Sequence, residues 1–289
     1  MILSFENVSK SYGSVPALTD MSFGVDRGEI VAVLGPNGAG KTTALEIATG
    51  LRRADSGSAK LFGGSPANAV ARQRLGVTPQ ESGFPDNLRA EEIVAFAGAH
   101  YPRASDTDDV LDEFGLAALR HRRAATLSGG ESRRLAVALA FCGNPELAVL
   151  DEPTTGLDVE SRRRLWDAVR ACAQHRSILF TTHYLEEAEA MASRIVVIDR
   201  GRVLYDGEPR HLRTRFGTRR LSYVGEAIEP RNPALSAAVV RANGRIVVAT
   251  NDTDAYVRAL VQTGTPFAEL EIAPATLEEA FLSLTEVSK

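Results

Sequence analysis

The residues with the clearest chemical potential lie in one glycine-rich stretch, 35–43, which reads GPNGAGKTT. It follows the apolar run 30–34 and fits the pattern G-x-x-x-x-G-K-[ST] between a predicted strand and a predicted helix. The backbone N–H groups of such a loop, together with the N-terminus of the following helix, attract a chain of phosphates. The sequence therefore predicts a binding site for a nucleoside triphosphate with its metal ion.

The polar groups of this loop suit a triphosphate that carries a metal ion. The ammonium of Lys41 is expected to contact the β- and γ-phosphates, and the hydroxyl of Thr42 is expected to bind Mg²⁺. Glycines allow the backbone to wrap closely around the phosphates. The nucleotide-binding residues predicted here are Asn37, Gly38, Ala39, Gly40, Lys41, Thr42 and Thr43. A chance glycine-rich loop is the alternative, and the flanking strand and helix count against it.

Carboxylates that can complete the site follow the apolar run 147–150. An apolar strand that ends in a carboxylate places it at the sheet edge where ligands bind. Asp151 is expected to join the Mg²⁺ shell, and Glu152 to polarise a water for attack on the γ-phosphate. His183 suits the γ-phosphate or that water, and the amide of Gln80 suits Mg²⁺ or water. Taken singly, the carboxylates fit a solvated turn and His183 fits a structural histidine.

Composition limits the protein class. The chain has 289 residues, 44% of them hydrophobic, and its 37 acidic and 33 basic residues give a net charge of -4. This balance gives no reason to expect a nucleic-acid partner. Cys142 and Cys172 lack metal or redox spacing, which favours buried thiols in a reducing compartment. We expect no signal peptide and no membrane span, so a membrane role would require a partner.

The elements that must position these residues follow an α/β pattern. Near-continuous apolar strands that alternate with helices predict a parallel sheet covered on both faces. Residues 86–144 interrupt this pattern as a helical insertion. The strands are expected at 2–5, 29–34, 148–150, 177–181 and 195–199, with helices at 41–49 and 161–174.

The pattern changes near Gly217. Residues 245–250 and 268–272 predict strands, the second of them half-buried, and Asp252 can cap a helix. A capping box at 276–279 predicts a final helix. We therefore expect a main domain at 1–216 and a small α+β extension at 217–289.

The segment 127–131, LSGGE, predicts a second anion-binding surface. Ser128 with Gly129 and Gly130 at a helix start can bind phosphate. One nucleotide hardly needs two such surfaces in one chain, so each copy of the chain is expected to close its Ser128 surface on the γ-phosphate of a second copy. The alternative is an ordinary serine N-cap followed by a glycine turn.

These motifs, in this order, resemble the ATP-binding subunit of an ABC transporter over residues 1 to about 216. The matches are Tyr12 with the aromatic that stacks on adenine, 35–43 with Walker A, Gln80 with the Q-loop, 127–131 with the signature, 149–152 with the end of Walker B, 156–158 with the D-loop and His183 with the switch histidine.

The resemblance implies a RecA-like P-loop NTPase core with an antiparallel β edge. It implies the cofactors ATP and Mg²⁺, and a head-to-tail pair of cassettes, expected to be two identical copies, with two ATP molecules between them. The residues implied are Glu152, His183 and Lys41 for catalysis; Thr42, Gln80 and Asp151 for the metal; and Ser128, Gly129, Gly130 and Glu131 for the partner's nucleotide. Glu131 departs from the usual glutamine: it keeps the acceptor and loses the amide donors.

Residues 217–289 resemble the C-terminal extension of ABC-2 type exporters. The resemblance implies an ATP-hydrolysing subunit that powers export of drugs or other hydrophobic or polymeric cargo. It also implies a permease docked near 84–101, and hence a cytoplasmic location on the inner face of the membrane. An importer subunit, a soluble ABC ATPase, a small-molecule kinase and a non-catalytic regulatory module are the alternatives.

Overall fold

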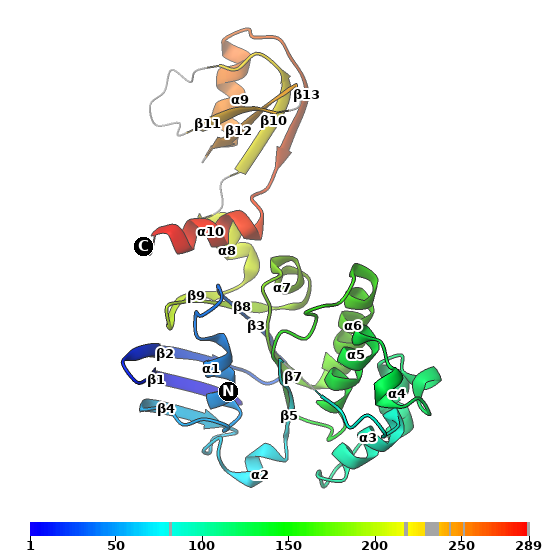
Figure 1. Cartoon of the computed structure of the whole chain (residues 1–289). Helices are drawn as coiled ribbons and strands as arrows, with labels where there is room; N and C mark the ends of the chain where they lie inside the picture. Colours follow the sequence, from blue (N-terminus) through cyan, green and yellow to red (C-terminus); the bar gives the residue numbers. More distant parts are fainter. Residues whose placement is uncertain (81–82, 217–218, 229–236, 243, 251, 288–289) are drawn as a thin grey trace. The chain divides into compact units, whose positions relative to one another are not determined.

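The computed structural model of the protein describes residues 1–80, 83–216, 219–228, 237–242, 244–250 and 252–287. The chain forms two compact units, Met1–Gly207 and Glu208–Lys289 (Figure 1). The boundary lies one helix before the sequence-based boundary at 216/217, because α8 (Pro209–Phe216) packs against α10 (Leu277–Val287) within the second unit. No helix in the described ranges is long and apolar enough to cross a bilayer.

A six-stranded sheet with the order β5-β6-β7-β3-β8-β9 organises the first unit. All its pairs are parallel except β8 with β9, which confirms the predicted parallel sheet. Its strands are largely buried and apolar, as expected for strands covered on both faces, except the edge strand β9, which has no buried residue. They are β3 (Ile30–Leu34), β5 (Leu75–Thr78), β6 (Leu147–Leu150), β7 (Ser177–Thr181), β8 (Arg194–Asp199) and β9 (Arg202–Gly207). Their pairing brings the carboxyl ends of β5, β6, β7 and β3 to one edge.

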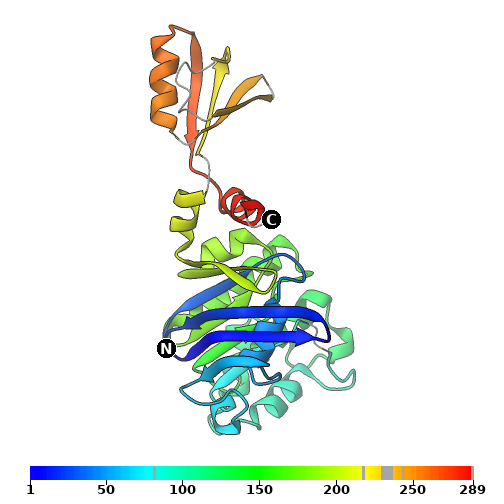
Figure 2. The same cartoon turned by 90° about the vertical axis from the view of Figure 1, so that its left-hand side faces the viewer.

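A three-stranded antiparallel sheet with the order β2-β1-β4 forms the predicted β edge. Figure 2 shows its long strands in blue, side by side. The strands are β1 (Leu3–Tyr12), β2 (Val15–Val25) and β4 (Ser56–Leu61). The sequence predicted only 2–5, because polar residues interrupt the rest of β1, where the pairing register shifts after Phe5 and after Val8.

Helices carry the remaining parts of the first unit. Residues 86–144, all of them described, contain helices and no strand. The helices are α1 (Lys41–Ala48), α2 (Ala69–Arg72), α3 (Ala90–Gly98), α4 (Thr107–Glu113), α5 (Gly129–Leu139), α6 (Val159–Cys172) and α7 (Leu185–Met191), with short 3₁₀ turns at Ala117–Leu119, Ala124–Thr126 and Ala173–His175.

The core of the first unit brings α5 very close to β5. A Cβ at Gly76 in β5 would lie 1.7 Å from the carbonyl oxygen of Ala140 at the end of α5, so only glycine fits there. Cys142 and Cys172 are buried free thiols, as predicted. Burial raises the pKa of Cys142 to about 11 and that of Cys172 to about 12.

Besides α8 and α10, the second unit contains an antiparallel sheet with the order β11-β12-β10-β13, together with α9. Its core contains Leu221, Tyr223, Ile246, Val248, Tyr256 and Leu260. The elements are β10 (Arg219–Gly225), β11 (Ala237–Ala242), β12 (Arg245–Thr250), α9 (Thr253–Gln262) and β13 (Phe267–Ala273). β13 is an edge strand with Ile272 48% exposed, so the expected half-burial holds only at Leu270.

Two predicted helix caps of this unit are confirmed. Asp252 accepts the N–H of Ala255 at 2.9 Å and begins α9. Thr276 and Glu279 exchange side-chain and backbone hydrogen bonds at the start of α10, which is a capping box.

Candidate nucleotide-binding and catalytic site

The glycine-rich loop links β3 to α1. Gly40, the N-cap residue, has φ 103°, and a Cβ there would lie 2.6 Å from the carbonyl oxygen of Ala17, so the position requires glycine. Lys41 is only 6% exposed, and its Nζ donates to the carbonyl oxygens of Gly35 at 2.7 Å and Pro36 at 3.0 Å. Burial lowers the pKa of Lys41, while Glu152 and Asp151 act in the opposite direction.

A polar cavity of about 320 Å³ opens above this loop. Its volume is in the range of small-ligand sites. Gln80 reaches it from the end of β5, and Glu152 from the end of β6. The lining residues are Ala17, Asn37, Gly38, Gly40, Lys41, Thr42, Thr43, Gln80 and Glu152. The fold therefore brings most of the predicted loop residues together with two predicted residues from distant strands.

Two predicted nucleotide contacts lie outside this lining. Ala39 is buried within the loop, at 2% exposure. Tyr12 is 42% exposed at the end of β1, and the guanidinium of Arg52 lies 5.0 Å from its ring centroid. Its role toward adenine stays a prediction.

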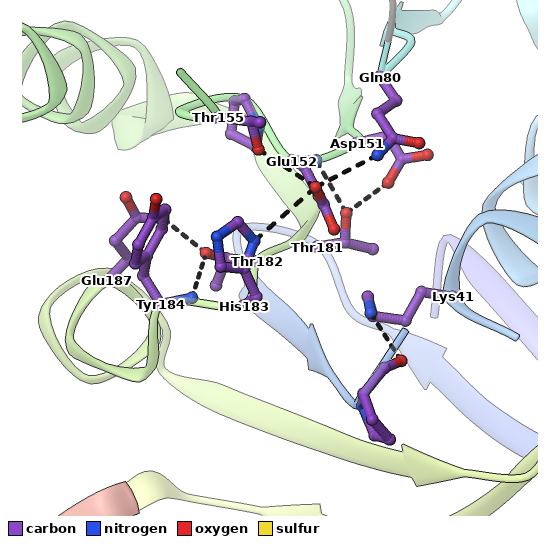
Figure 3. A network of polar contacts seen from close by, with 12 residues as sticks. Lys41, Gln80, Asp151, Glu152, Thr155, Thr181, Thr182, His183, Tyr184 and Glu187 are labelled. Atoms are coloured by element: carbon purple, nitrogen blue, oxygen red, sulfur yellow. Dashed lines mark hydrogen bonds and ion pairs between the residues drawn. The ribbon is translucent and has the colours of Figure 1, made fainter. Parts of the chain in front are cut away.

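The carboxylates after β6 are anchored by a threonine at the end of β7 (Figure 3). The hydroxyl of Thr181 donates to Asp151 Oδ1 at 2.5 Å and accepts the backbone N–H of Glu152 at 2.9 Å. Glu152 has φ 45°, a left-handed conformation that is unfavourable for residues with a Cβ. Thr181 thus holds one side of a strained turn.

The Glu152 carboxylate lies at the centre of the polar network in Figure 3. Its Oε2 accepts from Gln80 Nε2 at 3.3 Å and from Thr155 Oγ1 at 3.1 Å. His183 Nδ1 lies 3.8 Å from the same oxygen, and the histidine side chain is 43% exposed. Two of the side chains predicted for catalysis, Glu152 and His183, therefore meet at the carboxyl ends of the adjacent strands β6 and β7.

The three residues predicted to bind Mg²⁺ are among those that line one further, mainly apolar cavity of about 320 Å³ beside α1. They are Thr42, Gln80 and Asp151. A hydroxyl, an amide oxygen and one carboxylate match the preference of Mg²⁺ for oxygen ligands, few of them carboxylates, in the presence of substrate phosphates. The donor set fits this ion.

The 127–131 segment lies elsewhere: none of its residues lines the nucleotide cavity. Ser128 is the N-cap of α5, where its hydroxyl accepts the N–H of Glu131 at 3.2 Å and the Glu131 carboxylate accepts the N–H of Ser128 at 2.7 Å. Ser128 is therefore a helix N-cap and Glu131 completes a capping box, whereas Gly129 and Gly130 begin the helix and do not form a turn. This arrangement leaves the proposed contact with a second chain untested.

Glu131→Gln is expected to destabilise the protein by about 0.3–1 kcal/mol near neutral pH, because a negative charge favours a helix N-terminus. The hydrogen bond from the Ser128 N–H holds the pKa of Glu131 below its ordinary value, with help from the Ser128 hydroxyl, Arg122 and Arg134. A lowered folded pKa gives stability that is present above the unfolded pKa and is lost as the pH falls through the folded pKa.

Urea unfolding at several pH values measures the difference in free energy of unfolding between the wild type and Glu131→Gln. This difference should shrink in acid. The control is Glu6→Gln, which replaces an exposed carboxylate. A difference that stays constant from neutral to acid pH would contradict the charge effect.

Sequence reasoning missed three residues that the fold brings to the site. Thr181 and Thr155 hold the carboxylates, and Arg133 contacts the backbone of the same turn. The terminal position of Thr181 in a predicted strand was a usable signal. No local feature separates Arg133 from its neighbour Arg134.

A mainly parallel sheet with a phosphate-binding loop between β3 and α1 defines a P-loop nucleotide-binding protein. A profile described as ABC transporter matches residues 18–155. The chain belongs to the ABC transporter family, as an ATP-binding subunit.

Relatives extend the match over almost the whole chain. The chain is 36% identical over 295 aligned positions to the Nod factor export ATP-binding protein I of Burkholderia pseudomallei (strain K96243), covering 98% of this chain and 96% of that protein. It is 38% identical over 227 positions to the doxorubicin resistance ATP-binding protein DrrA of Mycobacterium tuberculosis (strain CDC 1551 / Oshkosh), covering 75% and 69%.

Solved structures agree on the fold. An ATP-binding subunit of an ABC transporter matches with a TM-score of 0.68 and 29% identity, covering 75% of this chain and 93% of that one. A dimeric ATP-binding cassette bound to ADP and phosphate matches with a TM-score of 0.65 and 23% identity, covering 71% and 98%. At the lower identity the likeness concerns the fold alone.

Proposed function

We propose that this subunit binds and hydrolyses ATP with Mg²⁺ and thereby powers an exporter. The observation that carries the proposal is the convergence of Lys41, Gln80 and Glu152 on one cavity. A buried ammonium, an amide and a carboxylate are the groups that phosphoryl transfer to water requires: charge neutralisation and an oriented nucleophile.

The positions of the side chains support the catalytic roles that we propose. Lys41 neutralises charge on the phosphates, and Glu152 accepts the proton of the attacking water. His183, 3.8 Å from the Glu152 carboxylate, orients the water or the γ-phosphate. Thr42, Gln80 and Asp151 would hold Mg²⁺, which when bound neutralises phosphate charge. Asn37, Gly38, Ala39, Gly40 and Thr43 complete the phosphate cradle, and Tyr12 stacks on adenine.

A second cassette supplies the remaining contacts in this proposal. The exposed Ser128 and Gly129 at the start of α5, with Gly130 and Glu131, bind the γ-phosphate held by the other subunit. Asp158 lies at the start of α6, where it caps the helix through Ser161. In the proposed pair it also contacts the second subunit.

Export is supported by the relatives. The proteins named for Nod factor export and for doxorubicin resistance are ATP-binding proteins, and the first aligns with 98% of this chain. We therefore propose that residues 217–289 are an extension of an ABC-2 type exporter cassette at 1–216. Drugs or other hydrophobic or polymeric molecules are the proposed cargo.

The proposed permease contact lies within 84–101. On α3, Ile93 and Val94 are buried, so they belong to the core, whereas Phe96 is 68% exposed and contacts the ring of His100. An exposed aromatic side chain on a short helix suits a protein interface. Docking there would place the subunit on the cytoplasmic face of the membrane.

A photoreactive phenylalanine analogue at position 96 tests this function in cell membranes. We expect a cross-link to an integral membrane protein after irradiation. Val70 on α2, which is apolar and 66% exposed, is the matched control position. Equal labelling from positions 70 and 96, or an adduct with a soluble protein only, would argue against a transporter subunit.

A further inference from the structure

α5 carries a guanidinium whose donors are all engaged, although the proposed site makes no use of it. Arginine has five N–H groups, and each of those of Arg133 donates to a backbone carbonyl. Nε donates to Pro153 at 3.0 Å; Nη1 donates to Pro79 at 2.9 Å and Gln80 at 3.0 Å; Nη2 donates to Asp151 at 2.8 Å and Glu152 at 2.9 Å.

The five acceptors belong to two turns only. One turn follows β5 and contains Gln80; the other follows β6 and contains Asp151 and Glu152. These are the turns whose side chains line the two cavities described above. Because every acceptor is a main-chain oxygen, Arg133 determines where these backbones lie relative to each other and to α5.

The Glu152 turn is the part of the site that needs such support. Its left-handed φ of 45° is unfavourable for a residue with a Cβ. Thr181 binds its N–H, and Arg133 binds its carbonyl oxygen and that of Asp151. Without the guanidinium, the carbonyl oxygens of Asp151 and Glu152 lose these hydrogen bonds, and the Glu152 carboxylate can turn away from the cavity.

The same helix carries the surface proposed to meet a second subunit. Ser128 caps α5, and Arg133 lies about one and a half turns further along it. A helix of this length moves as a rigid element, so a shift at its N-terminus also displaces the guanidinium. Burial lowers the pKa of Arg133 while Asp151 and Glu152 raise it, and an arginine stays charged in either case.

We propose that Arg133 is a positioning residue that ties the Gln80 and Glu152 turns to α5, so that contact at Ser128 sets the placement of Glu152. This inference rests on the proposed ATPase function. Lysine cannot replace the arginine, because an ammonium has three donors and lacks the planar fork that reaches both turns.

Turnover and nucleotide affinity of Arg133→Ala provide the first test. We expect kcat to fall about 100-fold, as for a misplaced catalytic group, with the Kd for ATP nearly unchanged. Guanidinium ions, added well below denaturing concentration, should restore part of the lost kcat, whereas urea should not. Arg163→Met, on the exposed face of α6, is the control. Unchanged kcat, or loss of kcat and affinity together without rescue, would overturn the proposal.

Hydrogen exchange gives a measurement that does not depend on turnover. In Arg133→Lys without nucleotide, the backbone N–H groups of Glu152 and Thr155 should exchange faster, while those of β8 should not change. Unaltered exchange at Glu152 overturns the proposal even if Arg133→Ala does not fold. If Arg133→Lys speeds exchange as expected but the wild-type chain never hydrolyses ATP, the proposed function is refuted and the positioning role of Arg133 is not.

Discussion

Glu152→Gln is expected to lower kcat for ATP hydrolysis by about 10²- to 10⁴-fold, the usual contribution of a general base. The amide cannot accept the proton of the attacking water. Its oxygen can still accept the hydrogen bonds from Gln80 and Thr155, so the geometry of the cavity should survive. ATP affinity should therefore remain. Initial-rate assays with Mg²⁺ and ATP, together with nucleotide binding, measure both quantities.

The control for this substitution is Glu6→Gln, which removes an exposed carboxylate on β1. It should leave kcat unchanged. If Glu152→Gln turned over ATP at the wild-type rate, the role of Glu152 as base would be refuted.

The same variant tests the proposed pair of subunits. ATP that cannot be hydrolysed should hold two chains together, because the γ-phosphate bridges the loop of one and the Ser128 surface of the other. Solution scattering of Glu152→Gln saturated with Mg²⁺ and ATP should give dimers. Monomers under these conditions, with and without the membrane component, would remove the basis for the shared site.

Lys41→Ala is expected to weaken ATP binding by about 10- to 150-fold, since hydrogen bonds to charged groups contribute roughly 1.5–3 kcal/mol. In the structure the Lys41 ammonium is buried and donates hydrogen bonds to the carbonyl oxygens of Gly35 and Pro36, so its position within the loop is already fixed. Titration with a fluorescent ATP analogue measures the change in Kd.

Lys60→Ala is the matched control, because Lys60 is a half-exposed lysine on β4 whose ion pair with Glu6 is long, at 3.6 Å. Its Kd should equal that of the wild type. Thermal unfolding without nucleotide checks that the loop of Lys41→Ala remains folded. Equal Kd values for both variants would exclude Lys41 as a phosphate contact.

Features that the sequence predicted well have all their partners nearby in the chain. The phosphate loop spans nine consecutive positions between a strand and a helix. The capping box at 276–279 joins residues three apart. Such patterns are visible because one turn of backbone already brings the groups together.

Features that were missed depend on non-local pairing. β1 continues to Tyr12 although its second half is polar, because β2 pairs with it as far as Tyr12 and β4 as far as Ser9. The register shifts of β1 hide the alternation that would reveal a strand. Likewise, the half-buried pattern expected for β13 fails because the strand lies at a sheet edge.

The sequence by itself therefore determined which chemical groups this ATP-binding subunit possesses and which strand ends carry them. Only the tertiary structure decided which groups meet: the sheet order β5-β6-β7-β3 brings Gln80 and Glu152 to the cavity of Lys41, and His183 to Glu152. It also gives Arg133 acceptors that lie 18 to 54 positions away along the chain. Contacts at that separation depend on how layers pack, and no local pattern of residue types encodes them.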